Sequence, residues 1–267
     1  MLAKIWNLAL LVILDGLRRH ALIALLVLAF LLETGGLFFF QFIPRDIGRA
    51  SADFILSVGW LTGLLFLLFH AIQVVAWDEE RRTIHTLLAR PISRTQYVFG
   101  IYLALALLLL ALNSVLAVIG YGILDIIQKS VKPTYFTSLS VGYYALAWLG
   151  LYLIELMLLA VILLFSGLVR GGFKVLLLSV SYYFICTGLP VAREAVKGDG
   201  GAALAGILKG MAAFFPDFSR FDFKSLVTAP PGRPLADYVG GDCLLAAVYI
   251  AVLLTVTAII YQQRDLQ

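Results

Sequence analysis

The densest polar stretch of the chain, residues 78–96, separates two long apolar runs and reads DEERRTIHTLLARPISRTQ. Residues Glu80 to Ala89 suit a short helix with acidic residues near its N-terminus, where the helix dipole favours them. Pro91 stops that helix, and Ser93 is placed to cap the next one. A short rigid helix between two spans is suited to transmit a conformational change from a soluble partner to the membrane helices. The alternative is a solvated connection with the arginines usual on the cytoplasmic side.

Two carboxyl groups are the next candidates for chemistry, because both fall inside apolar runs. Glu33 lies deep in the first run, and Glu155 lies near the middle of the fourth. A carboxylate at such depth costs on the order of 2.5–3.5 kcal/mol on insertion scales, so it normally faces protein or a water-filled path. One interpretation makes both residues lining groups of a translocation path for a polar or cationic substrate. The other makes them neutral carboxyls hydrogen-bonded to neighbouring helices.

Residue types that support catalysis or metal binding form no recognisable motif. Residues 201–206 begin like a nucleotide-binding loop, but isoleucine and leucine follow where lysine and serine or threonine are needed. The three histidines are far apart and form no H-E-x-x-H pair. The two cysteines also lack metal-ligand spacing. We therefore expect no catalytic residue, metal site or cofactor in this chain, so any energy from ATP must arrive through another polypeptide.

Composition identifies the elements that must position these groups. Of the 267 residues, 62% are hydrophobic and only 13% are charged. Several runs exceed the roughly 20 apolar residues that cross about 30 Å of hydrocarbon. The net charge of +4 reflects basic residues at helix ends, which indicates contact with anionic lipid rather than with nucleic acid. The chain is therefore expected to be an all-α, polytopic membrane protein.

We predict one transmembrane domain over residues 1–267 with about six spans. The predicted spans are Ala21–Ile43, Phe54–Trp77, Tyr97–Ile127, Val141–Val169, Val175–Arg193 and Asp242–Tyr261. Residues 1–20 are expected to form an amphipathic elbow helix in the membrane interface. The alternative, a cleaved signal peptide, lacks the small-residue cleavage site. The connection 194–241 is expected outside the cell, with Ala202–Phe215 as an interfacial or re-entrant helix.

Basic residues in the short connections predict the orientation. Most of them lie on the side that holds residues 78–96, which makes that side cytoplasmic and places both termini inside. Those residues are Lys4, Arg18, Arg19, Arg81, Arg82, Arg90, Arg94, Arg170, Lys174 and Arg264, whereas Arg45, Arg49, Lys129 and Lys132 lie on the other side. Basic residues in 194–241 weaken this count without reversing it, because long connections influence topology less.

A small-residue motif in the second predicted span allows neighbouring helices to approach closely. Gly59 and Gly63 are four residues apart, so they lie on the same face of the helix. Packing within one subunit is one account of this motif, and a dimer interface is the other.

The 78–96 loop resembles a known family. Its pattern, D-x-E-x-R-T at 78–83 followed by L-L-A-R-P-I-S-R at 87–94, is similar to the first cytoplasmic loop of type-2 ABC transporter permeases. Arg82 stands where the family commonly has glycine. The opening helix with two arginines before the first span and the closing R-D-L are also similar to that family. The length of the chain and its number of spans agree with this resemblance.

The resemblance implies a permease of the exporter type in a bacterial inner membrane. Such a permease forms a homodimer and binds two copies of a separate ABC ATPase, which holds ATP and magnesium. The coupling residues that it implies are Asp78, Glu80, Arg81, Arg82, Thr83, Leu87, Arg90 and Arg94. The span layout and the F-P-D-F segment at 215–218 are somewhat similar to permeases of metalloenzyme maturation or copper processing.

Two other classes of function stay open at this point. A scaffolding or regulatory membrane subunit would bind a soluble partner without moving a substrate, and it would have a sealed core. A lipid-modifying enzyme would need clustered acids or histidines at one membrane face, and the sequence has no such cluster.

Overall fold

A computed structural model describes residues 2–18, 20–40, 47–75, 93–132, 136, 139–199, 206, 208, 210–211, 215–228 and 235–263. Within these residues the chain is helical and contains no strand, which confirms the predicted all-α class. The long helices are α1 (Leu2–Arg18), α2 (His20–Phe40), α3 (Ile47–Leu65), α6 (Arg94–Ser130), α7 (Val141–Leu168), α8 (Gly172–Asp199) and α10 (Leu235–Gln263). A π-helical turn, η1 (Phe66–Ala71), extends α3.

Five helical stretches are long and apolar enough to cross a membrane, as expected of a multi-pass membrane protein. They are Ile47–Val75, Arg94–Ser130, Val141–Leu168, Gly172–Glu194 and Gly240–Gln263. The first of the six predicted spans corresponds to α2, whose apolar part Leu22–Gly36 is shorter than these stretches. The count of six spans therefore stays a prediction.

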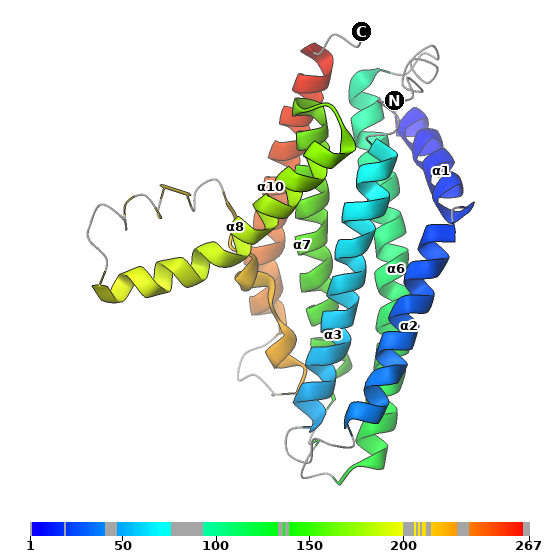
Figure 1. Ribbon diagram of the computed structural model, residues 1–267, viewed down its shortest axis with the longest axis vertical. Coiled ribbons are helices and arrows are strands. Elements are labelled where there is room, and N and C mark those ends of the chain that lie inside the picture. The colour runs from blue at the N-terminus through cyan, green and yellow to red at the C-terminus, as the bar shows by residue number, and fades with distance from the viewer. Residues whose placement is uncertain are drawn as a thin grey trace.

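Helices α6 and α7 form the centre of the bundle (Figure 1). α10 packs against α7, α1 packs against α6, and α2 and α3 pack against each other and against α6. Gly100 of α6 allows the approach of α1, since a Cβ atom there would lie 2.7 Å from Leu8. The beginning of α1, the beginning of α6 and the end of α10 lie at the same end of the bundle (Figure 1).

Helix α1 occupies the predicted elbow position and ends at Arg18. Its buried face is narrow and includes Leu8 and Ala9, whereas Trp6 and Leu17 are more than half exposed. An exposed apolar surface of this kind is expected for a helix that lies in the membrane interface.

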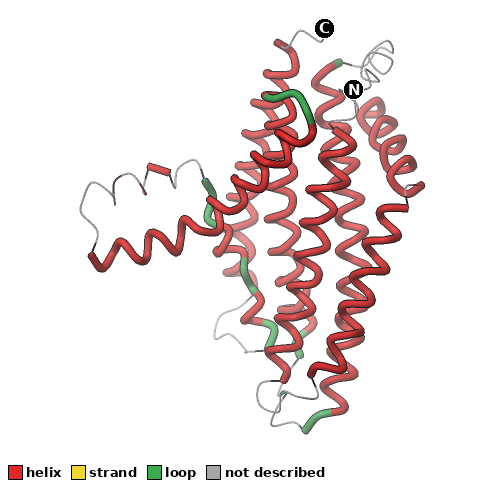
Figure 2. Tube along the Cα trace, viewed as in Figure 1, coloured by secondary structure: helices red, strands yellow, loops and turns green. Residues whose placement is uncertain are grey.

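The last two apolar stretches, Gly172–Glu194 and Gly240–Gln263, agree with the predicted spans to within three residues, but the helices that contain them are longer. α8 runs obliquely across the bundle, and its C-terminal part extends away from it (Figures 1 and 2). Pro190 lies inside this helix, where it removes one backbone hydrogen bond. α10 begins at Leu235 rather than at Asp242, and Asp242 forms an ion pair with Arg220 at 3.4 Å.

Residues 215–228 of this connection pack against α3 and α7 through the short 3-10 helices η2 (Phe218–Phe221) and η3 (Lys224–Leu226). Phe218 and Phe221 are buried there. Gly150 of α7 permits the contact, because a Cβ atom at this position would lie 2.2 Å from the backbone oxygen of Phe221. The predicted interfacial or re-entrant helix was placed at Ala202–Phe215, most of which lies outside the described residues. The segment that packs into the bundle is residues 215–228, which follow the predicted helix in the chain.

Candidate functional site

Most of the predicted coupling loop lies outside the part of the chain that the structure describes. This holds for Asp78, Glu80, Arg81, Arg82, Thr83, Leu87 and Arg90. The described chain resumes at Ser93, which caps α6 as predicted. Its hydroxyl accepts from the backbone N–H of Gln96, and the Gln96 side chain accepts from the backbone N–H of Ser93.

Arg94, the one described member of the predicted coupling set, joins the start of α6 to the end of α10. Its guanidinium donates to the backbone oxygens of Tyr261 at 3.1 Å and Gln262 at 3.0 Å. These carbonyls belong to the last turn of α10, where backbone acceptors lack partners within the helix and the helix dipole is negative. Arg94 therefore has a structural role that the loop pattern did not indicate.

Replacing Arg94 with alanine should weaken the attachment of the end of α10 to α6 without affecting the buried core, where Tyr97 and Tyr261 still pack together. Because charge-assisted hydrogen bonds at a partly exposed helix end are lost, we expect a stability loss of about 1 kcal/mol. Thermal unfolding of the purified protein measures this loss, with Arg94→Lys as a variant that keeps the charge. A melting temperature equal to that of the wild type would contradict the structural role.

Glu155 lies on α7 at the contact of three helices and is fully buried. Asn113 of α6 donates from Nδ2 to Glu155 Oε2 at 2.5 Å. On the other side, Gly63 of α3 faces the same carboxyl, since a Cβ atom at Gly63 would lie 1.8 Å from Glu155 Oε1. The carboxyl group therefore occupies space that only a glycine at position 63 leaves open.

Gly59 packs against the same helix, one turn from Gly63. A Cβ atom at Gly59 would lie 2.3 Å from the Trp148 ring of α7. Both glycines of the predicted small-residue motif are thus covered by α7 within one chain. Their face of α3 is occupied in the single subunit, so it is not available to a second copy.

Glu33 lies on α2 and is also fully buried, but its surroundings differ from those of Glu155. Neither of its carboxyl oxygens has a hydrogen-bond partner among the described residues. It lies close to α6, because a Cβ atom at Gly120 would be 3.7 Å from Glu33 Oε1 and 2.8 Å from the Tyr144 hydroxyl. That hydroxyl donates to the backbone oxygen of Ala117 at 2.9 Å.

The two carboxyl groups lie at different heights along α6. Glu155 is bonded to Asn113, and Glu33 lies beside Gly120. Seven residues are about two turns, or about 10 Å of helix, and return to nearly the same face. The structure therefore brings both predicted path residues next to α6, but it does not place them in contact with each other.

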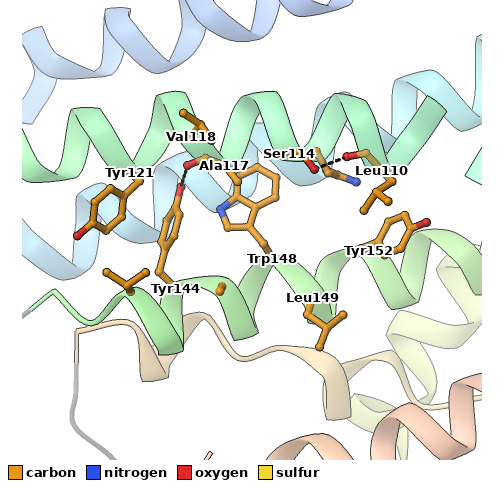
Figure 3. Close-up of a pocket in the computed structure, with 12 residues that line it drawn as sticks. Leu110, Ser114, Ala117, Val118, Tyr121, Tyr144, Trp148, Leu149 and Tyr152 are labelled. Carbon is orange, nitrogen blue, oxygen red and sulfur yellow. Dashed lines mark hydrogen bonds between the residues drawn. The ribbon is translucent and has the colours of Figure 1, made fainter. Parts of the chain in front are cut away.

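An aromatic stripe on α7 is a feature of this region that the sequence prediction missed. Tyr144, Trp148 and Tyr152 recur every four residues, so they lie on one face of the helix. Figure 3 shows these side chains between α7 and α6, opposite Tyr121. The spacing was visible in the sequence, but in an apolar helix a single aromatic stripe is most often ordinary packing.

No group of three or more histidine, cysteine, aspartate or glutamate side chains that could hold a metal ion occurs within the described ranges. Cys186 is a buried free thiol, and Cys243 is a partly buried one. Compared with protein-family models and with curated protein sequences, the chain matches none. The structure itself establishes a helical, multi-pass membrane protein with buried carboxyl groups between its helices.

Proposed function

We propose that the chain is the permease subunit of an ATP-binding-cassette exporter in a bacterial inner membrane. It would act as a homodimer with two copies of a separate ATPase, which binds ATP and magnesium. The observation that carries this proposal is the polar pattern of residues 78–94, which resembles the first cytoplasmic loop of type-2 ABC permeases. Because residues 201–208 lack the side chains that a nucleotide-binding loop needs, the energy would come from the partner.

The positions of the buried groups support a mechanical link between this loop and the membrane interior. The loop joins the end of the α3–η1 helix to the start of α6. Glu155 of α7 contacts both of these helices, through Gly63 on α3 and Asn113 on α6. A force that shifts α3 relative to α6 would act directly on this contact.

The π-helical turn Phe66–Ala71 lies between the loop and Gly63. Single π-helical turns are frequent at functional sites and mark places where the regular hydrogen-bond ladder is interrupted. In the proposed mechanism this turn absorbs part of the displacement when the ATPases close. The homodimer would use a surface other than Gly59 and Gly63, because α7 of the same chain covers both glycines.

The proposal predicts that charge reversal at Glu80 removes the ATPase from the complex. If the loop helix sits in a groove on the ATPase, a like-charge contact costs binding free energy. We expect Glu80→Lys to reduce the captured ATPase activity by about tenfold, equivalent to ~1.4 kcal/mol. The measurement is ATP hydrolysis in the eluate after capture of the tagged chain from its native membrane.

Asp125→Lys is the matched control, because it reverses an acidic charge at the opposite end of α6. Asp125 is paired with Lys129 on the surface of that helix, and an exposed pair of this kind contributes little to stability. The control should retain the ATPase activity of the wild type. Absence of ATPase activity in the wild-type eluate would refute the exporter and leave the scaffolding subunit as the explanation.

A further inference from the structure

A groove of about 430 Å³ lies between α6 and α7, within the size range of small-molecule sites (Figure 3). We call it the α6–α7 groove. The side chains that matter for its chemistry are Asn113, Ser114, Tyr121, Tyr144, Trp148 and Tyr152. Val118 and Val141 also line it and are 74% and 61% exposed. Since both helices are apolar enough to cross a membrane, the groove opens toward lipid.

The body of the groove is suited to an apolar chain. Tyr121 and Tyr144 have ring centroids 5.6 Å apart, and Tyr144 and Trp148 have centroids 6.3 Å apart in an edge-on arrangement. These rings form a continuous aromatic wall along the groove. Its volume of about 430 Å³ lies toward the lower end of the range for small-molecule sites, which favours a single hydrocarbon chain over a helix of a second copy.

Most hydroxyl groups of the groove offer acceptors rather than donors, and the indole N–H of Trp148 is a donor without a hydrogen-bond partner among the described residues. Three hydroxyl groups that line it already donate to backbone oxygens: Ser114 to Leu110 at 2.7 Å, Tyr144 to Ala117 at 2.9 Å and Tyr152 to Ala106 at 3.0 Å. Each of these oxygens keeps lone pairs but has no second hydrogen to give. A ligand that forms hydrogen bonds with them must therefore bring its own donor.

Asn113 indicates independently that a ligand in the groove needs a hydrogen-bond donor. Its side-chain nitrogen donates to Glu155, and it is only 4% exposed. Its Oδ1 atom has no hydrogen-bond partner among the described residues. A buried acceptor without a donor is costly, and this one belongs to a residue that lines the groove.

We propose that the α6–α7 groove binds a single-chain amphiphile whose polar end carries a hydrogen-bond donor. The donor bonds to Asn113 Oδ1, and the hydrocarbon chain lies along Tyr144 and Trp148. This inference does not depend on the proposed export function, because it concerns binding from the membrane and requires no ATPase.

Fluorescence of Trp148 tests the proposal directly in the full-length chain. The other three tryptophans, Trp6, Trp60 and Trp77, are changed to phenylalanine, so that all emission comes from the groove. The purified protein is titrated in detergent with dodecanol brominated at mid-chain, because bromine quenches an indole that it contacts. The matched probe is the methyl ether of the same molecule, which accepts hydrogen bonds but cannot donate one.

We expect saturable quenching, with the alcohol half-saturating at about five- to tenfold lower concentration than the ether, as one hydrogen bond predicts. Asn113→Leu should remove this difference between the probes. Ala145→Phe, which fills the groove from an exposed position, should abolish the saturable quenching by both.

Three results would overturn the proposal. The first is quenching that rises without saturation, as from probe dissolved in the micelle. The second is equal or reversed affinity of alcohol and ether in the wild-type groove. The third is a pair of observations: the protein shows no saturable quenching, and Ala145→Phe converts a dimer into monomers. A second copy of the chain would then cover the groove.

Discussion

Replacing Gly63 with alanine should destabilise the protein by about 3 kcal/mol, at the upper end of the range for overpacked interiors. The added Cβ atom would lie 1.8 Å from Oε1 and 2.5 Å from Cδ of Glu155, so the carboxyl must move. That movement also disturbs the hydrogen bond from Asn113. The loss therefore combines steric strain with a weakened buried hydrogen bond. Thermal unfolding in detergent is the measurement.

Gly122→Ala on α6 is the matched control for this change. Gly122 is exposed, and a Cβ atom there meets no atom within 4 Å. An alanine in this helix should stabilise the protein by about 0.5–1 kcal/mol. Equal melting temperatures for Gly63→Ala and Gly122→Ala would show that α3 and α7 do not pack as described. A Gly63 variant that stays stable but changes its oligomeric state would restore the dimer interpretation of the glycine motif.

The helical elements were largely predictable because their signals are local. Long apolar runs identified the spans, and Ser93 marked the start of α6 through a pattern that involves only the next turn. The last two apolar spans were predicted to within three residues, but the ends of helices α8 and α10 were not. Both helices continue into polar residues, α8 past Arg193 and α10 before Asp242, and apolar composition does not mark such ends.

The two buried carboxyl groups were also predictable, because an acidic residue in an apolar run stands out. The pairing of Glu155 with Asn113 was not predictable, because the two residues are 42 positions apart in the sequence. That contact depends on the register between α6 and α7, which no local pattern specifies. The role of Arg94 is a similar case. Its bonds to the end of α10 cross more than 160 positions.

Replacing Glu33 with leucine should raise the stability of the protein by about 1–3 kcal/mol. The carboxyl group is fully buried, and neither oxygen has a hydrogen-bond partner among the described residues. Leucine is of similar size and carries no polar atom that needs a partner. The melting temperature of Glu33→Leu compared with the wild type measures the change.

Glu155→Leu is the informative comparison, because it should have the opposite effect. This substitution leaves the Asn113 amide without its acceptor in a buried position, which costs about 1–3 kcal/mol. Opposite signs for the two variants would separate a carboxyl that stabilises the fold from one that does not. A destabilised Glu33→Leu variant would mean that Glu33 has a partner outside the described residues or in a second copy.

A residue that costs stability without supporting the fold is expected at a functional position. If the chain is the proposed permease, we therefore expect Glu33 to meet water during the transport cycle. Glu33→Cys, made with Cys186→Ala and Cys243→Ala, should react with a membrane-impermeant maleimide when the ATPase-bound complex hydrolyses ATP. Without ATP it should be protected, because the site is closed in the structure described here. Equal protection in both conditions, in a complex that hydrolyses ATP, would exclude Glu33 from a translocation path.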